Sequence, residues 1–266
     1  MPKGIKGKKG KGLSKENRTR VPEPPAQAKT MAEPGASQQP SLDLTEEQLA
    51  KVTQQLMLQI VESLSLAPAT DCIKILCVSS SIVKRAADFA RTMPGGTKLG
   101  LKQAGISIWW QGYSGLKFMA LQKKIITLLK YEHPPDFLFI HCGANDIGQT
   151  LLQELLQCVD PLIEFVEKKL PGTKLIWSQM LPHLSWRYSE NDAAMDRSRG
   201  RFNRTVAKKV LKSGRCYVKY PEILKKPKHL FEKDGVHLSP TGNAILVNTI
   251  EEAVCTFKWS ESPVYP

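Results

Sequence analysis

The sequence predicts an α/β fold of three layers, in which a doubly wound parallel sheet is covered by helices on both faces. The first observation is that short apolar runs alternate with longer segments of helical periodicity. The expected strands are 73–78, 106–110, 137–141, 175–177 and 216–218, and the helices that follow them are 82–92, 115–132, 150–170, 197–213 and 240–257. Such alternation is typical of parallel sheets. The second observation is the length of 266 residues, which suits one substantial core with appendages.

The N-terminal segment 1–41 is expected to be a disordered basic tail. Residues 1–40 hold nine Lys or Arg, three acidic residues and almost no large apolar side chains. Such a segment buries too little apolar surface to offset its ordering entropy. Within it, residues 1–20 carry a cluster of lysines that predicts contact with nucleic acid or another polyanion. A nuclear address and a merely solubilising tail are the alternatives.

Residues 42–67 are expected to form an amphipathic helix. Apolar side chains recur near a period of 3.6 residues, and Thr45 precedes two glutamates at the expected start. Pro68 disfavours helical geometry in the residue before it and so ends the helix. The helix either packs on the domain or mediates self-association through 42–66. The main domain is then 71–258, and 259–266 is a C-terminal tail.

Several classes of protein are excluded by composition. No apolar stretch approaches the roughly 20 residues that span a bilayer, and the N-terminus lacks the pattern of a signal peptide. An intracellular protein, cytoplasmic or nuclear, is therefore expected. The six cysteines show no metal-ligand spacing, and several lie in apolar runs. Neither a metal, a disulfide nor a cofactor is indicated.

The first expected strand is followed by three serines, Ser79, Ser80 and Ser81. In a doubly wound sheet, ligands bind outside the carboxyl ends of the strands. A hydroxyl at this place stands at a helix N-terminus, where free N–H groups favour a developing anion. The alternative is that a serine simply caps the helix. The other strand ends decide between the two.

The remaining strand ends also carry polar or glycine residues. The second strand leads into Gly112 and Gly115, which allow a sharp turn. The third leads into 143–146, Gly-Ala-Asn-Asp, where Asn145 offers a carboxamide and Asp146 is expected to cap the helix that follows. Near the end of the domain, Asp234 and His237 are three residues apart, so they can meet in one tight turn.

The order and spacing of these residues resemble those of the SGNH (GDSL-like) hydrolases, whose four blocks supply Ser, Gly, Asn and His. The resemblance covers the domain but not the tail, and it implies a flavodoxin-like fold. It implies that Ser81 is the nucleophile of a serine esterase and that Asp234 and His237 complete its catalytic residues. The backbone N–H groups of Ser81 and Gly115 and the side chain of Asn145 are then expected to form the oxyanion hole.

The chemistry that the resemblance implies is hydrolysis of a carboxylic ester, such as an acetyl, acyl or lipid ester, through an acyl-enzyme. The segment after the fourth strand is expected to wall the substrate pocket with Trp186, Arg187 and Tyr188. His141 is expected to be a core residue of its strand, and His133 a surface loop residue.

One departure from the family pattern concerns its first block. The family has Gly-Asp-Ser, whereas this sequence has Ser79-Ser80-Ser81, so Ser79 must avoid the positive φ that glycine tolerates. This departure leaves an alternative: a catalytically inactive protein of the same fold that serves in nucleic-acid binding or assembly. The layout of a basic tail, a helix and an esterase-like domain is also similar to esterase-containing proteins of mobile elements.

Overall fold

The structure is a computed structural model that describes residues 45–65 and 72–266. The chain divides into two compact units, Met1–Glu62 and Ser63–Pro266. The tail expected for residues 1–41 lies outside the described residues. Among the residues that are described, no helix combines the length and the apolar character needed to cross a bilayer.

Helix α1, Glu46–Ser65, forms where the sequence predicts an amphipathic helix over 42–67, and it lies in the first unit except for its last three residues. Thr45 and Gln48 begin the helix with a reciprocal cap: the Thr45 N–H donates to Gln48 Oε1 at 3.0 Å, and the Gln48 N–H donates to Thr45 Oγ1 at 3.4 Å. Leu49, Val52 and Leu56 lie at helical spacing and are about half exposed. Self-association through this exposed apolar face stays a prediction.

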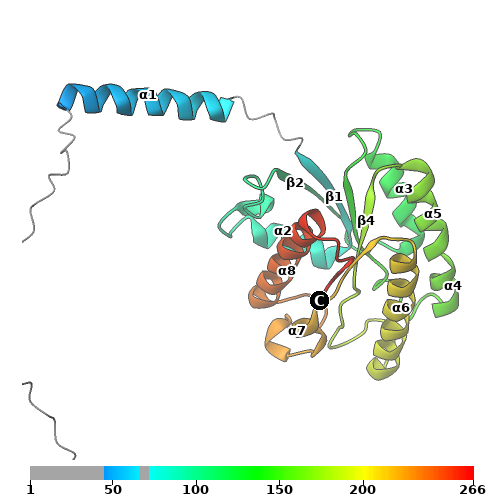
Figure 1. Ribbon diagram of the computed structural model, residues 1–266. Helices are drawn as coiled ribbons and strands as arrows, with labels where there is room; N and C mark the ends of the chain where they lie inside the picture. Colours follow the sequence, from blue (N-terminus) through cyan, green and yellow to red (C-terminus); the bar gives the residue numbers. More distant parts are fainter. Residues whose placement is uncertain (1–44, 66–71) are drawn as a thin grey trace, which may run out of the picture. The chain divides into compact units, whose positions relative to one another are not determined.

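The second unit is built on a sheet of six parallel strands in the order β2-β1-β3-β4-β5-β6 (Figure 1). The strands are β1 Ile73–Ser79, β2 Ile106–Gly112, β3 Phe137–His141, β4 Lys174–Ser178, β5 Cys216–Val218 and β6 Val264–Tyr265. Because β1 lies between β2 and β3, the chain winds outward from β1 in both directions. The doubly wound α/β fold that the sequence predicts is therefore confirmed.

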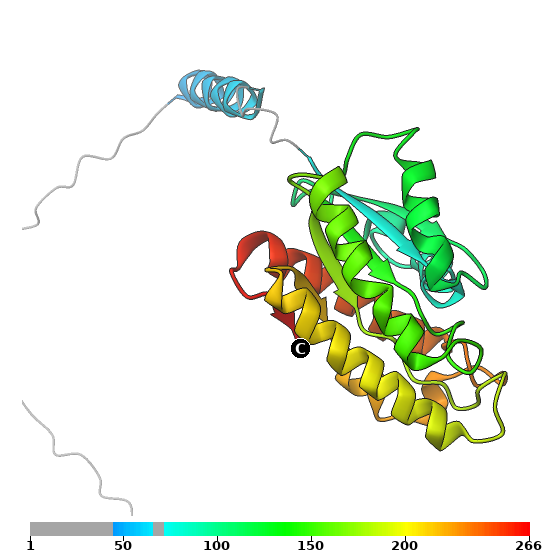
Figure 2. The same cartoon turned by 90° about the vertical axis from the view of Figure 1, so that its right-hand side faces the viewer.

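Helices cover both faces of this sheet. They are α2 Ser81–Ala90, α3 Phe118–Leu128, α4 Leu152–Gln157, α5 Val159–Lys169, α6 Asp192–Lys212, α7 Pro221–Leu224 and α8 Pro240–Trp259, with short 3-10 turns η1 Gly96–Lys98 and η2 Lys228–Leu230. The helices α2 and α8 pack on one face, whereas α3, α5 and α6 pack on the other (Figures 1 and 2).

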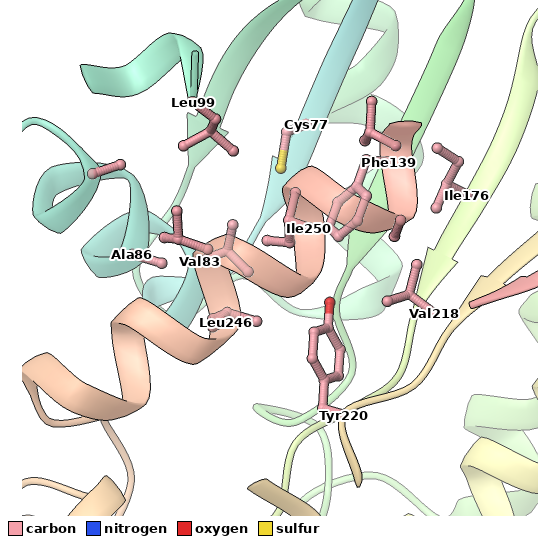
Figure 3. Packing of buried hydrophobic residues seen from close by; sticks show 14 of the residues in the cluster. Cys77, Val83, Ala86, Leu99, Phe139, Ile176, Val218, Tyr220, Leu246 and Ile250 are labelled. Atoms are coloured by element: carbon pink, nitrogen blue, oxygen red, sulfur yellow. The ribbon is translucent and has the colours of Figure 1, made fainter. Parts of the chain in front are cut away.

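Successive side chains of a strand point to opposite faces of the sheet, so each strand contributes to the core on both faces. In β1, Ile75 and Cys77 face the core beneath α2 and α8, and Leu76 and Val78 face the core on the other side. Figure 3 shows the first of these cores, where Val83 of α2 lies close to Ile250 and Leu246 of α8. A strand that is buried on both faces is expected to be apolar at consecutive positions, and the buried stretch 75–78 of β1 is apolar throughout.

The sequence predicts that Pro161 breaks or kinks the third helix, and this helix is divided into α4 and α5 at Cys158. Pro161 lies in the first turn of α5, where its missing N–H has no helical partner to lose. One feature of the fold differs from the strands that the sequence predicts. The C-terminal segment forms strand β6, which pairs with β5 through Tyr217 and Val218. A two-residue strand held by long-range pairing carries no periodicity of its own, so the sequence does not reveal it.

Gly112 at the end of β2 allows α2 to approach the sheet closely. A Cβ at this position would lie 2.8 Å from the Cα of Lys84, and Lys84 is one turn beyond Ser81 on α2. We expect Gly112→Ala to push α2 outward and to lower the free energy of unfolding by about 1–3 kcal/mol, measured by urea denaturation.

The matched control for this substitution is Gly200→Ala, inside α6. A Cβ there meets nothing nearer than the flexible guanidinium of Arg204, at 3.4 Å. The free energy of unfolding should then stay the same or rise by up to about 1 kcal/mol, because alanine is the better helix former. An equal loss in both variants would contradict the close approach of α2 as the cause.

Candidate active site

Ser81 is the first residue of α2 and follows β1 by one residue. The backbone of Ser80 is extended, and its N–H donates to the carbonyl of His141 at 3.2 Å, which ties the turn to the end of β3. Leu99 and Lys226 are the non-glycine residues with positive φ among those described, so Ser79 has an ordinary backbone conformation. A serine at position 79, where the SGNH pattern has glycine, therefore puts no strain on this turn.

Asp234 and His237 lie in the tight turn that precedes α8. Gly235 has a φ of 68°, and a Cβ there would lie 2.9 Å from Ser185 Oγ, so the turn requires glycine. His237 Nδ1 lies 2.6 Å from Asp234 Oδ2, and His237 Nε2 lies 3.0 Å from Ser81 Oγ. Ser81 thus joins Asp234 and His237, a pair more than 150 residues further along the sequence, in one chain of hydrogen bonds.

The Asp234 carboxylate is held in its ionised form. Burial alone would raise its pKa, but hydrogen bonds from the His237 ring and from the backbone N–H groups of His237 and Val236 bring the pKa well below its usual range. Both N–H groups donate to Oδ1 at 2.9 Å, which leaves Oδ2 for the ring. A carboxylate in this position fixes the imidazole tautomer with Nδ1 protonated and Nε2 facing Ser81.

Gly115 and Asn145 follow β2 and β3 and line the same pocket as Ser81 and His237. Gly115 has a φ of 71° with open space where a Cβ would be, so its backbone conformation rather than crowding requires glycine. Asn145 Nδ2 donates to the carbonyl of Leu116 at 3.1 Å, which orients the carboxamide and uses one of its two N–H groups. The second N–H remains for a ligand.

Asp146 has a different partner from the one that the sequence predicts. Its Oδ2 accepts a hydrogen bond from the N–H of Phe118 at 3.0 Å, so it caps the start of α3 and not the helix that follows it. Leu151 at the start of α4 has no side-chain cap. The expected cap was therefore wrong, because the buried Asp146 binds the first residue of α3, which lies 28 residues before it in the chain.

The pocket above Ser81 has a volume of about 370 Å³, and its walls include the three residues predicted from the segment after β4. Trp186 is buried, and its ring lies 4.2 Å from that of His183, centroid to centroid. Arg187 and Tyr188 are exposed at the rim. Trp186 thus builds the pocket wall, while Arg187 and Tyr188 are accessible to a ligand.

Two histidines that the sequence analysis did not assign to the site lie beside it. His183 lines the pocket, and His141 is buried beneath the turn of Ser80, with its Nδ1 2.9 Å from Ser178 Oγ. Ser178 Oγ is in turn 2.6 Å from the hydroxyl of Tyr220. The position of His141 in an apolar strand indicated a core residue, but nothing local in the sequence indicated this buried polar chain.

Burial lowers the pKa of both His141 and His183 to about 4, and a neighbouring histidine lowers each pKa further: His183 acts on His141, and His237 acts on His183. Both rings are therefore neutral near pH 7. Within the parts of the chain that the structure describes, no group of three or more His, Cys, Asp or Glu side chains is placed to hold a metal ion.

Acidification should destabilise the protein through these two histidines. Each folded-state pKa of about 4 lies below the ordinary value of 6.5, so protons bind the unfolded chain first as the pH falls below 6.5. We expect each of the two histidines to lower the free energy of unfolding by about 2 kcal/mol as the pH falls from 7 to 5, measured by urea denaturation. Asp234 does not contribute in this window because its carboxyl is ionised in both states.

The variant His141→Asn should flatten this pH dependence by about 2 kcal/mol, since the substituted side chain does not titrate. The exposed His133 provides the control, and His133→Asn should follow the wild-type curve. If His141→Asn also followed it, the buried neutral state of His141 would be wrong.

The comparison with protein-family models found no match, and neither did the comparison with curated protein sequences. Solved structures do match. A GDSL-like lipase from Parabacteroides merdae has a TM-score of 0.56 and 19% identity, covering 70% of this chain and 96% of that structure. An acetylxylan esterase from Geobacillus stearothermophilus has a TM-score of 0.52 and 17% identity, covering 68% and 94%.

An SGNH hydrolase from Slackia heliotrinireducens matches with a TM-score of 0.52 and 15% identity, covering 69% of this chain and 99% of that structure. Two further matching structures are catalytic mutants of the acetylxylan esterase, one at a serine and one at an aspartate. The second unit of this chain spans nearly the whole length of these structures, and it has the SGNH hydrolase fold.

Proposed function

We propose that this protein hydrolyses a carboxylic ester, with Ser81 as the nucleophile, His237 as the general base and acid, and Asp234 as the residue that orients the imidazole. The observation that carries the proposal is the continuous hydrogen-bond chain from Asp234 through His237 to Ser81, which opens into a pocket. Each distance is within the range over which a proton can be transferred. The fold that the chain shares with GDSL-like lipases and an acetylxylan esterase supports the same chemistry.

In the first half of the reaction, His237 Nε2 accepts the hydroxyl proton of Ser81 while Oγ attacks the carbonyl carbon of the ester. The carbonyl oxygen becomes an oxyanion. The backbone N–H groups of Ser81 and Gly115 and the second N–H of Asn145 are the donors that stabilise it. The tetrahedral intermediate collapses, the proton on His237 passes to the leaving alkoxide, and an acyl-Ser81 ester remains.

In the second half, a water molecule gives its proton to His237 and attacks the acyl carbon. A second oxyanion forms in the same place, and its collapse releases the acid and returns the proton to Ser81 Oγ. The ionised Asp234 lowers the free energy of the imidazolium that forms in both halves. The proton transfers in both halves of the reaction run between Ser81, His237, water and the leaving group.

We expect Ser81→Ala to abolish turnover of a short-chain aryl ester and labelling by a fluorophosphonate probe. Asp234→Asn should lower kcat by about 10⁴-fold because the imidazole loses its orienting partner, and Asn145→Ala should lower it by about 10²–10³-fold. Mass spectrometry of the labelled peptide measures the labelling, and steady-state kinetics measure the turnover.

Ser80→Ala is the matched control, because Ser80 is the neighbouring serine, is buried and makes no side-chain cap hydrogen bond. It should keep both labelling and turnover. Wild-type protein that is neither labelled nor active would instead favour the alternative, a catalytically inactive protein of this fold.

The charges at the pocket further favour an ester that carries an anionic group. Lys84 and Arg85 are three and four residues beyond Ser81, so they lie on the same face of α2 as the nucleophile. Arg187 adds a third cation from the loop after β4. The carboxylate of Asp88 also lines the pocket, but Arg91 lies 3.7 Å from it. Positive charge therefore predominates around the place that the ester would occupy.

Arg85→Gln and Arg187→Gln should each raise KM for an aryl ester that bears a carboxylate by about fivefold, because an exposed charge pair contributes up to about 1 kcal/mol. The KM for the neutral ester of the same shape should stay unchanged, and kcat should stay unchanged for both esters. Equal effects on the charged and neutral esters would show that the arginines only shape the pocket.

A further inference from the structure

The outer face of α6 carries a continuous stripe of positive charge. The residues of this helix that are exposed between positions 197 and 212 are all Arg or Lys: Arg197, Arg201, Arg204, Lys208 and Lys212. At 100° per residue they fall within an arc of about 80°, and at 1.5 Å per residue they extend over about 22 Å. We call these five residues the α6 stripe. Figure 2 shows α6 (yellow) along one side of the α/β unit.

The α6 stripe lacks the acidic partners that accompany lysines on other helices of this protein. In α1, Lys51 pairs with Glu47, and in α5, Lys168 pairs with Glu164, both four residues apart. Within residues 45–65 and 72–266, none of the five stripe residues forms an ion pair. The carboxylate of Asp196 binds Arg199 at 3.1 Å and also Lys226, and it lies off the stripe.

Charge repulsion makes this arrangement unfavourable for the helix itself. Like charges three or four residues apart destabilise a helix, and the stripe contains four such neighbouring pairs. The dipole of the helix offsets this only for the last turn, near Lys212. An ordinary solvated helix would mix in glutamates, so the unmixed stripe indicates an anionic binding partner.

We propose that the α6 stripe is a binding site for the phosphate backbone of nucleic acid, independent of base sequence. Each strand of a duplex carries a phosphate about every 3.4 Å, so about six phosphates lie alongside 22 Å of helix. A linear array of cations matches this linear array of anions. Arginine also binds phosphate oxygens with two N–H groups at once. The proposal does not rest on the esterase chemistry.

The surface around the stripe favours nucleic acid over an anionic membrane. Side chains that insert into a bilayer are large and apolar, and the exposed large apolar residues of the described chain include none on α6. The exposed side chains of the α6 stripe are all charged, which suits contact with phosphates at the surface of a duplex. The net charge of +13 for the whole chain adds long-range attraction of the same sign.

The test is fluorescence anisotropy of a labelled 24-base-pair duplex DNA of mixed sequence with the full chain, at several salt concentrations between 50 and 200 mM. The stripe variant is Arg201→Gln, Arg204→Gln, Lys208→Gln and Lys212→Gln combined, which keeps good helix formers. We expect its affinity at 100 mM salt to fall by at least about tenfold. The plot of log affinity against log salt should become less steep by about 3–4, because about four phosphate contacts are lost.

The matched control neutralises four exposed lysines elsewhere: Lys98→Gln, Lys102→Gln, Lys123→Gln and Lys130→Gln combined. It has the same net charge as the stripe variant, so it separates the location of charge from its amount. For the control, the slope of log affinity against log salt should stay within about 1 of the wild-type slope. Thermal melting and ester turnover of both variants, each expected to match wild type, show that the domain is intact.

Equal losses in the stripe variant and the control would overturn the proposal, because total charge would then explain the binding. Unchanged binding of the stripe variant would overturn it too and would leave the basic residues 1–20 as the contact. Vesicles of phosphatidylserine and phosphatidylcholine complete the test: binding to vesicles that depends on the stripe, without binding to the duplex, would identify a membrane surface instead.

Discussion

The pairing of β1 between β2 and β3 is the constraint on which the rest of the site depends. Because the chain winds outward from β1 in both directions, the carboxyl ends of these three strands meet at the point where the direction reverses. Ser81, Gly115 and Asn145 follow these three strands in turn, and all three line one pocket. The hydrogen bond from the Ser80 N–H to the carbonyl of His141 joins the ends of β1 and β3 directly at this point.

The turn before Ser81 shows how a changed motif is accommodated. A glycine in the first block of the family pattern would tolerate a positive φ, but Ser79 has no positive φ in this structure. Close approach is instead provided by Gly112, which pairs with Ser79 in the sheet and faces the Cα of Lys84. The absence of a side chain at Gly112, in the neighbouring strand, is thus what lets α2 lie near the sheet.

Much of this fold follows from local patterns, and the exceptions share one cause. The buried strands can be predicted from the sequence because both faces of a parallel strand are apolar. Ser81 lies after a strand end and Asp234 and His237 lie in a tight turn, the places where the sequence predicts functional residues. By contrast, the cap from Asp146 to Phe118, strand β6 and the chain from His141 through Ser178 to Tyr220 all join residues far apart in sequence. Neither periodicity nor spacing encodes such pairings, which depend on how the finished layers pack.

The charged side chains of α2 and of α6, both in the second unit, differ in their surroundings. On α2, Lys84, Arg85 and Asp88 line the same pocket as Ser81, so their effect is local to the pocket. On α6, the buried face with Phe202 and Val206 completes the core, which leaves the outer face free to carry only cations. A helix that is anchored on one side by apolar packing tolerates like-charge repulsion on the other side, because its stability comes from burial rather than from surface pairs. That division allows the α6 stripe and the pocket to be altered independently of each other.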